Sequence, residues 1–505
     1  MSITSYVFFI FIAVVLFVYY FCVPKRFQWV ALLVASYTFY YFAGVELFLW
    51  MLTTTLTVYF AAIRIAKSQS VPAKRGIIAL TAVCNFGFLA FFKWYNTLAG
   101  LFNRLSAGAF QLPMNTLLLP LGISFYTFQA IGYLVDVYRG TVKPERNPAR
   151  FALFVSFFPQ LIQGPISRHN QLADQLYASR KPDYTQVKHG FQLMLWGLFK
   201  KLVIADRLVL MGSAIFGSPQ NYPGLYIPIG LIASALQLYT DFSGGVDIAR
   251  GVAQMLGIVM PQNFRRPFFA ASLPEYWRRW HMTLNEWWRD YLFYPLALSK
   301  PLTKFSRFIR KHLGHELGKV ISVYLCINVV RVVNAMWHGA SFMYVASGFY
   351  HGILIVLGMV CAPLFKKVIR ALRINTSCAS WKFFQILRTF LLVCLARVFL
   401  MSSGFINGLR AIKSMVVNFN PWIINFDSVF LIGLSRRDVR IILFSLLVLL
   451  VVSILQERGI EMRKMLEKQN ILFQWLLMIG CLVIILLWGR YGYGYDPAAF
   501  IYMGF

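Results

Sequence analysis

Two histidines are the residues whose type and setting best suit acid–base chemistry. His338 lies in the apolar stretch Val332–Phe342, within Met-Trp-His-Gly, and His281 follows Arg-Arg-Trp in a stretch rich in tryptophan. An imidazole buried among apolar side chains stays neutral near pH 7 and can accept a proton. A structural hydrogen bond explains a single buried histidine equally well. The setting of His338 therefore predicts either a general base or a satisfied structural histidine.

Motifs for other kinds of catalysis are absent from the sequence. It contains no H-E-x-x-H pattern, no G-x-S-x-G elbow and no P-loop. The seven cysteines are scattered and form no C-x-x-C pair, and no group of His and Cys has the spacing of metal ligands. We therefore expect no metal and no bound cofactor, and general-base chemistry is what remains.

A dense group of ionisable and aromatic residues lies between 241 and 311. It contains Asp-Phe-Ser-Gly-Gly-Val-Asp from 241, Glu-Tyr-Trp-Arg-Arg-Trp-His from 275, and a basic cluster from 300 to 311. Arginines interleaved with aromatic residues are typical of an interfacial belt. The same residues could instead line a pocket for the phosphates of a nucleotide-like donor. The residues that we predict to line such a pocket are Asp241, Ser243, Asn263, Arg278, Arg279, Asn285 and Trp337.

The elements that must position these residues are predicted to be membrane-spanning helices. The chain has 505 residues, of which 59% are hydrophobic and only 13% are charged, so a soluble fold would expose large apolar patches. Spanning requires about 20 apolar residues, so we expect the shorter runs to be tilted, broken or re-entrant. Strand-like alternation is missing, which favours an all-α polytopic fold. The apolar runs are 7–22, 30–45, 50–63, 77–92, 115–135, 190–212, 225–240, 321–333, 342–362, 383–402, 441–455 and 473–489.

The charge of the chain fits a membrane protein better than a nucleic-acid-binding one. Lys and Arg number 49 against 18 Asp and Glu, but the basic residues occupy short loops between apolar runs. Such loops orient a chain with its basic side in the cytoplasm and contact anionic lipid. We expect a multi-pass protein of the cell membrane, with the lipid bilayer and no nucleic acid as a partner. The first apolar run, which follows no basic residue, is expected to be retained as a helix.

Several stretches, taken together and in order, resemble a known family. They are Pro120–Gln129, Asp136–Gly140, Phe158–Ile166, Gly197–Lys201 with Ala205 and Asp206, the 241–295 block, and Met336–Gly339. In this order they are similar to the membrane-bound O-acyltransferase (MBOAT) family, and within it to the bacterial branch that O-acetylates polysaccharides such as alginate and peptidoglycan. The resemblance to the teichoic acid D-alanylation branch is more distant.

The resemblance implies a fold, a reaction and partners. The family fold is a ring of helices around a tunnel, with re-entrant segments. It would occupy 1–505 as one membrane domain, with the catalytic core at 115–352. His338 matches the family's near-invariant histidine, which acts as the base, and His281 matches the second residue of its dyad. The donor would be a cytoplasmic thioester such as acetyl-CoA or a carrier-protein thioester. The acetyl group would pass outward to an SGNH-type transferase in the bacterial envelope and then to a polysaccharide.

The C-terminal segment 490–505 is rich in Gly and Tyr and ends in Phe-Ile-Tyr-Met-Gly-Phe. Alone it would be an aromatic interfacial tail. It also resembles the Phe-x-Tyr-x-x-Phe end of polysaccharide-modifying members of the family, where the tyrosine is the acyl carrier. By that likeness Tyr502 is a candidate covalent relay. A phenol, with a pKa of about 10, needs a base such as His338 to attack well.

Departures from the family pattern affect the substrate more than the reaction. Gly245-Val246 replaces the family's Tyr-Ser, and Arg265 replaces an Asn, while both histidines are kept. Two alternatives therefore stay open. One is D-alanyl transfer to teichoic acid. The other is a transporter or channel with structural histidines, which would tolerate His338→Ala. We expect a membrane O-acetyltransferase.

Overall fold

The structure is a computed structural model that describes residues 2–42, 44–106, 110–116, 120, 122–425, 432–492 and 495. Every regular element that these residues form is a helix, which confirms the predicted all-α fold. The chain divides into two compact units, each treated by itself below. Unit 1 takes in Met1–Val203, Thr240–Gln262 and Glu461–Phe505, and unit 2 takes in Ile204–Tyr239 and Asn263–Ile460. A single domain with a core at 115–352 stays a prediction.

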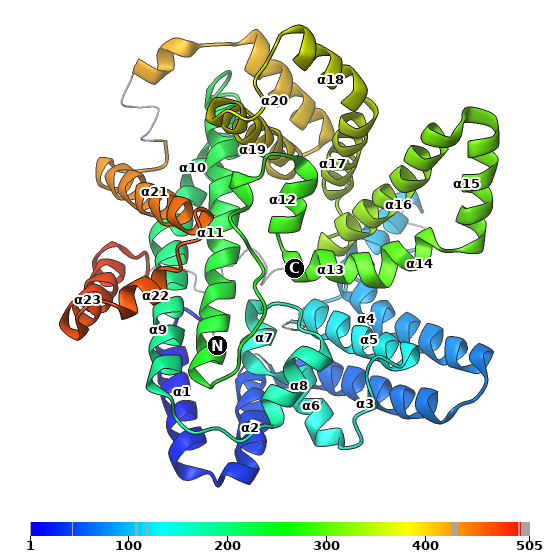
Figure 1. The fold of residues 1–505 in the computed structure, drawn as a ribbon, viewed down its shortest axis with the longest axis vertical. Coiled ribbons are helices and arrows are strands. Elements are labelled where there is room, and N and C mark those ends of the chain that lie inside the picture. The colour runs from blue at the N-terminus through cyan, green and yellow to red at the C-terminus, as the bar shows by residue number, and fades with distance from the viewer. Residues whose placement is uncertain are drawn as a thin grey trace. The chain divides into compact units, whose positions relative to one another are not determined.

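Unit 1 contains most of the N-terminal helices, and in it α3, α4 and α5 pack side by side (Figure 1). The long α11 (Tyr226–Met255) begins in unit 2, and its second half, from Thr240, belongs to unit 1. The other elements of unit 1 are α1 (Tyr6–Phe17), η1 (Val18–Cys22), η2 (Lys25–Phe27), α2 (Gln28–Tyr41), α3 (Val45–Lys67), α4 (Val71–Leu105), α5 (Ile123–Arg139), α6 (Pro148–Ser156), α7 (Phe158–Gln163), α8 (His169–Tyr177), α9 (Tyr184–Leu198), η3 (Phe199–Ala205), α22 (Met462–Glu467) and α23 (Ile471–Trp488).

Two pairs of glycines bring α9 and the second half of α11 unusually close together. A Cβ added to Gly190 would lie 2.5 Å from the carbonyl oxygen of Gly251, and one added to Gly197 would lie 2.5 Å from that of Gly244. Only glycine permits such backbone contact, which is a common device for packing helices within membranes. The π-helix η3 follows α9 directly, so this contact holds its side chains against α11.

Unit 2 is built around α16, which packs against α15 on one side and α17 on the other (Figure 1). Helix α17 in turn packs against α12 and α19. The elements of unit 2 besides the first half of α11 are α10 (Asp206–Gly217), η4 (Pro267–Phe269), α12 (Leu273–Arg279), α13 (Met282–Trp288), η5 (Arg289–Phe293), α14 (Tyr294–Ala297), α15 (Lys300–Leu313), α16 (His315–His338), α17 (Phe342–Val360), α18 (Ala362–Ala371), α19 (Ala379–Met401), α20 (Phe405–Val417), η6 (Pro421–Asn425) and α21 (Arg436–Glu457).

Seven helices among the described residues are long and apolar enough to cross a membrane: α3, α4, the Val320–His338 part of α16, α17, α19, α21 and α23. This confirms a multi-pass membrane protein. Not every one of the twelve apolar runs forms a helix of this length among the described residues. The run at 190–212 is interrupted by the π-helix η3, and the run at 30–45 forms the 14-residue α2. The run at 115–135 contributes to α5, whose side chains are almost all buried within unit 1.

Candidate active site

His281 lies at a sharp turn between two short helices of unit 2. Helix α12 ends at Arg279, α13 begins at Met282, and His281 between them has a left-handed backbone with φ 44°. That conformation is uncommon for a residue other than glycine and is often found at functional sites. The turn is fixed by pairing with the segment before η4, because Met282 N donates to Asn263 O at 2.9 Å and Arg265 N donates to Arg279 O at 2.9 Å.

The hydrogen bonds of Asn263 define the tautomer of His281. Asn263 Oδ1 accepts from the backbone N of Thr283 at 3.2 Å and from its hydroxyl at 2.9 Å, and lies 3.1 Å from His281 Nδ1. Because this oxygen is an acceptor, His281 Nδ1 must carry the proton that it donates, and the lone pair is on Nε2. His281 is 2% exposed, and burial lowers its pKa to about 3. The ring is therefore neutral at pH 7, with Nε2 as the basic atom.

His338 is the last residue of α16 and is half-buried. Its ring lies 4.4 Å from the ring of Trp337 and stacks on that of Tyr344, with centroids 5.8 Å apart and an interplanar angle of 19°. A Cβ on the next residue, Gly339, would lie 3.1 Å from Cε2 of Tyr344. A side chain there would press on the stacked ring, which gives a physical reason for the sequence Trp-His-Gly.

Trp337 connects the two imidazoles. Its ring lies 6.5 Å from that of His281, at 64°, as well as 4.4 Å from that of His338. Trp337 is 7% exposed, so the ring that both histidines contact is packed within the protein. The structure thus brings His281, Asn263, Trp337 and His338 together, although they come from segments about 60 to 75 residues apart along the chain. Their catalytic and lining roles stay predictions.

Asn285 lies in the same turn and stabilises its backbone. Its Nδ2 donates to the carbonyl oxygens of Trp277 at 3.0 Å, Trp280 at 2.6 Å and His281 at 3.2 Å. These contacts tie the end of α12 to the start of α13. Asn285 therefore holds the backbone that carries His281.

The neighbouring residues Arg278 and Arg279 have different surroundings. Arg279 Nη2 lies 2.7 Å from Glu275 Oε1 and 2.9 Å from Glu457 Oε1, and Arg266 Nε lies 2.7 Å from Glu457 Oε2. Arg279 is thus held within a network that joins α12 to α21. Arg278 is exposed and pairs with no carboxylate in the described part of the chain. Of the two guanidinium groups, that of Arg278 is the one available to a ligand.

Asp241 and Ser243 belong to unit 1, where both bind buried lysines of the π-helix η3. Asp241 accepts from Lys201 Nζ at 2.6 Å, and Ser243 Oγ accepts from Lys200 Nζ at 2.9 Å. Lys200 also pairs with Asp247 Oδ2 at 2.8 Å. Contact of Asp241 and Ser243 with a donor stays a prediction. Tyr502, the predicted acyl relay, lies outside the described residues.

A second polar group of unit 2 lies within the membrane-spanning helices and was missed by the sequence prediction. Arg331 is seven residues before His338, so both lie on one face of α16. Its guanidinium lies 3.9 Å from the centroid of the Trp277 ring, and the Trp277 and His351 rings pack nearly perpendicular to each other with centroids 5.0 Å apart. Arg331 has no carboxylate partner among the described residues. The signal was present in the sequence, because a lone arginine in an apolar run is a functional candidate by default.

Close packing between α16 and α17 completes this second group. A Cβ on Gly352 would lie 2.4 Å from Asn328 Oδ1, so the two helices touch one turn from Arg331. Asn328 Nδ2 donates to the carbonyl oxygen of Tyr324 at 2.9 Å, and both Asn328 and His351 are buried. We call Trp277, Asn328, Arg331 and His351 the arginine cluster. It offers a cation and hydrogen-bonding groups at membrane depth.

The two groups can support acid–base chemistry on a substrate with polar atoms. The imidazoles offer proton acceptors, and the arginine cluster offers a positive charge for a carbonyl or phosphate oxygen. Among the described residues, no three His, Cys, Asp or Glu side chains gather as ligands of a metal ion would.

Comparison with known proteins assigns the sequence to a family. The sequence model of "MBOAT, membrane-bound O-acyltransferase family" matches residues 144–402. A "Probable alginate O-acetylase AlgI" of Pseudomonas syringae pv. tomato is 32% identical over 400 residues, which are 78% of this chain and 71% of that protein. The chain belongs to the membrane-bound O-acyltransferase family. It is therefore an acyltransferase of the membrane, as predicted.

Two further relatives differ in the acyl group that their names state. The "Peptidoglycan O-acetyltransferase" of Helicobacter pylori is 30% identical over 384 residues, which cover 71% of this chain and 68% of that protein. The "Teichoic acid D-alanyltransferase" of Bacillus subtilis is 27% identical over 262 residues, with coverages of 50% and 62%. The family match begins at 144 and ends at 402, whereas the predicted core was 115–352.

Proposed function

We propose that this protein is a membrane O-acetyltransferase that takes acetyl from a cytoplasmic thioester, acetyl-CoA, and passes it outward for O-acetylation of a cell-envelope or extracellular polysaccharide. An SGNH-type transferase outside the membrane completes the transfer to the polysaccharide. The observation that carries the proposal is the shared contact of His281 and His338 with Trp337, in a chain of an acyltransferase family.

The proposed reaction uses His338 as the base. Its neutral imidazole removes the proton from the acceptor hydroxyl, and the oxygen attacks the carbonyl carbon of the thioester. The C–S bond breaks, the imidazolium returns its proton to the leaving thiolate, and an O-acetyl ester and free thiol result. General-base help of this kind contributes about 10²–10⁴-fold to a rate. The acceptor in the first step is the hydroxyl of Tyr502.

His281 orients the thioester or stabilises the oxyanion in this proposal. Its Nδ1–H is committed to Asn263, and its low pKa keeps the ring neutral through the physiological range. A neutral ring with its lone pair on Nε2 accepts a hydrogen bond, which suits an amide N–H of the donor or a proton on the acceptor hydroxyl. Stabilising an oxyanion would require a proton on Nε2, so the tautomer held by Asn263 favours the orienting role.

The arginine cluster gives the proposed donor a second contact. Arg331 is a cation without a carboxylate partner in the described chain, two helical turns from His338 on the same face of α16. Charged residues inside membrane segments mark substrate pathways, because their cost of burial is otherwise unopposed. We assign Arg331 to the polar atoms of the donor's thioester arm.

Acetyl, rather than D-alanyl, is the group supported by the relatives. Both O-acetylating relatives are at least 30% identical and cover more than two thirds of their own length, whereas the D-alanyltransferase is 27% identical over 62% of its length. The test below therefore includes a carrier-protein thioester as the alternative donor, and we do not propose it as a second function.

The experiment is labelling of the purified protein with radioactive acetyl-CoA, followed by intact-mass and peptide analysis. The wild type is expected to carry one acetyl group on Tyr502, and Tyr502→Phe none. The rate at which His338→Ala acquires the label should be at least a hundredfold lower than in the wild type, while its thermal unfolding temperature stays the same. A matched control is His189→Gln, which replaces a histidine bound to Glu467 at 2.8 Å in unit 1 and should be labelled as the wild type.

Three results would count against the proposal. Equal labelling of His338→Ala and the wild type would show that His338 is not the base. Label that persists in Tyr502→Phe would move the acceptor elsewhere. Labelling by a D-alanyl carrier protein, with none by acetyl-CoA, would replace the acetyl donor.

A further inference from the structure

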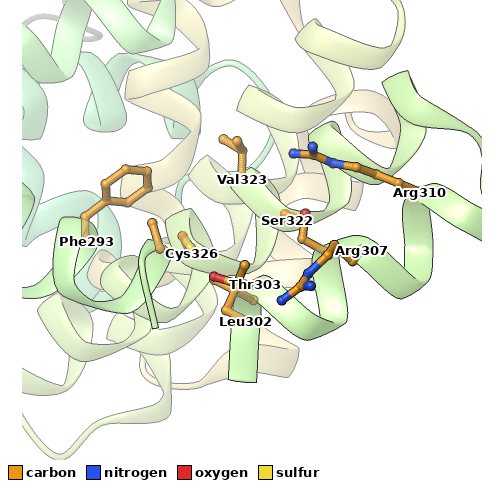
Figure 2. A pocket seen from close by; sticks show the side chains of 10 residues that line it. Phe293, Leu302, Thr303, Arg307, Arg310, Ser322, Val323 and Cys326 are labelled. Atoms are coloured by element: carbon orange, nitrogen blue, oxygen red, sulfur yellow. The ribbon is translucent and has the colours of Figure 1, made fainter. Parts of the chain in front are cut away.

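A pocket of about 260 Å³ lies in unit 2, between the η5–α14 segment, α15 and the first turns of α16 (Figure 2). Its lining changes character from one end to the other. Phe293 and Cys326 lie at one end, and Arg307 and Arg310 at the other, with Ser322 beside the arginines. The pocket therefore offers an apolar wall and a cationic mouth to one ligand.

The pocket is distinct from the histidine site. Cys326 at its inner end is twelve residues before His338 on the same helix, which corresponds to about 18 Å of helix rise. Neither His281 nor His338 lines it. Whatever the pocket binds is therefore not the reacting group of the transfer.

The helix that closes the pocket, α15, is basic and amphipathic. Its fourteen residues include five Lys or Arg and no acidic residue. None of these cations pairs with a carboxylate in the described part of the chain. Phe305 and Phe308 are 40% and 59% exposed, so apolar side chains as well as cations face outward. A helix of this kind lies in the membrane–water interface, drawn by apolar burial and by anionic headgroups.

The depth of the pocket agrees with that placement. The membrane-spanning part of α16 begins at Val320, and Ser322, Val323 and Cys326 of the pocket wall belong to its first two turns. The pocket thus lies where the chain enters the bilayer, at the level of lipid headgroups. Its apolar end, with Phe293 and Cys326, lies farther along the span than the arginines, toward the level of acyl chains.

The polar groups at the mouth are suited to a phosphate. Thr303 and Ser322 already donate their hydroxyl protons to the carbonyl oxygens of Ser299 and Gly318, at 2.9 and 2.8 Å. Ser306 and the two arginines are the lining groups with protons left to donate. Arginine forks match phosphate oxygens in geometry as well as charge.

We propose that this pocket binds an anionic phospholipid, with its phosphate at Arg307, Arg310 and Ser306 and the start of an acyl chain along Phe293, Leu302 and Val323. The position of the pocket at the start of the membrane-spanning part of α16 supports a lipid over a nucleotide donor. At about 260 Å³ the pocket is smaller than the range of about 300–1,000 Å³ that encloses a whole drug-sized ligand, so it admits a headgroup and the adjoining chain while the rest stays in the bilayer.

The test is native mass spectrometry of the full-length protein, titrated in detergent with phosphatidylglycerol or phosphatidylcholine. Phosphatidylglycerol is expected to bind at least tenfold more tightly, and the Arg307→Gln/Arg310→Gln double variant should lose that difference. The matched control is Lys366→Gln/Lys367→Gln on α18, a second basic amphipathic helix without a described pocket. This control should bind within twofold of the wild type.

A third variant, Val323→Trp, fills the middle of the apolar wall while leaving the charges in place. It should weaken phosphatidylglycerol binding as well, because the acyl chain loses its space. Equal affinity for the two lipids, or an equal loss in the control, would overturn the proposal by reducing it to general surface charge. Displacement of the lipid by free coenzyme A, at a site lost in the double variant, would overturn it in favour of a donor phosphate.

Discussion

Two polar regions of this protein differ in whether their cations are paired with carboxylates. In unit 1, Lys200 and Lys201 are 2% and 1% exposed, and each is hydrogen-bonded to a carboxylate of α11. In unit 2, Arg331 lies against the face of Trp277 and has no carboxylate partner among the described residues. A buried charge is costly unless it is paired. The carboxylates of α11 therefore compensate the charges of the two lysines, whereas the charge of the arginine is left for a ligand.

The difference separates structural from functional polarity within one membrane protein. Lys200 and Lys201 join the π-helix η3 to α11, and the glycine pairs of α9 and α11 hold the adjoining backbones together. The arginine cluster shares helix α16 with His338 and has hydrogen-bonding groups to spare. Polar residues in apolar helices are thus best sorted by whether their partners lie within the chain.

The largest effect is expected from breaking the ion pair between Lys201 and Asp241. Lys201→Met leaves the carboxylate of Asp241, which is 0% exposed, without its bonded ammonium group. We expect a loss of about 3–5 kcal/mol in the free energy of unfolding, measured by thermal or chemical unfolding in detergent. The double variant Lys201→Met/Asp241→Leu should recover most of that loss, because both charges are gone.

The double variant also tests the predicted contact of Asp241 with the donor. If Asp241 only balances Lys201, the double variant keeps its KM for acetyl-CoA. A stable double variant with a KM raised tenfold or more would give Asp241 a ligand. Exposed Lys366→Met is the control, and its stability should change by less than about 0.5 kcal/mol.

Removing the charge of Arg331 should affect donor binding and leave stability unchanged, which is the reverse of what is expected for Lys201. Arg331→Gln removes a partly buried charge that has no carboxylate partner among the described residues, so stability should stay the same or rise. The KM for acetyl-CoA should increase about ten- to a hundredfold, which is 1.4–2.8 kcal/mol of donor binding. Arg331→Lys should recover only part of it, because an ammonium lacks the planar fork. An unfolding temperature lowered by several degrees with an unchanged KM would instead make Arg331 structural.

Much of the fold class followed from the sequence, because apolar runs and a low charged fraction report burial in lipid directly. The number of spans did not follow. Hydropathy cannot distinguish a helix that faces lipid from one buried by protein, and α5 is of the second kind. Nor does it show a π-helix such as η3, whose buried lysines lie in the middle of an apolar run.

The candidate site was predictable in its residue types and less so in its partners. His281 and His338 were identified from their motifs, but the contact of both with Trp337 depends on packing between segments far apart in the chain. The pairing of Asp241 with Lys201 is equally non-local. Arg331 was readable in the sequence as a charge in an apolar run, and its ring partner was not.

His281 represents a third way to bury a titratable group, which is to keep it neutral. Its pKa is about 3 in the folded protein, against about 6.5 in an unfolded chain. Between these values the unfolded state binds more protons, so stability falls as the pH decreases below 6.5. The loss at pH 5.5 should be on the order of 1 kcal/mol. Unfolding temperatures from pH 7.5 to 5.5 should fall less in His281→Asn than in the wild type or in the exposed control His312→Asn.

The smallest expected effect repeats the comparison between two adjacent residues. Arg279 is held by Glu275 and Glu457, so Arg279→Gln should lower stability by about 1 kcal/mol and leave KM unchanged. Arg278 is exposed without a carboxylate partner in the described chain, so Arg278→Gln should leave stability unchanged. It should raise the KM for acetyl-CoA about two- to fivefold, because a single exposed charge contributes little more than steering. The effect should fade with added salt, since exposed charges are screened. A KM change that is insensitive to salt would instead place Arg278 in direct, water-excluded contact with the donor, beside the turn that carries His281.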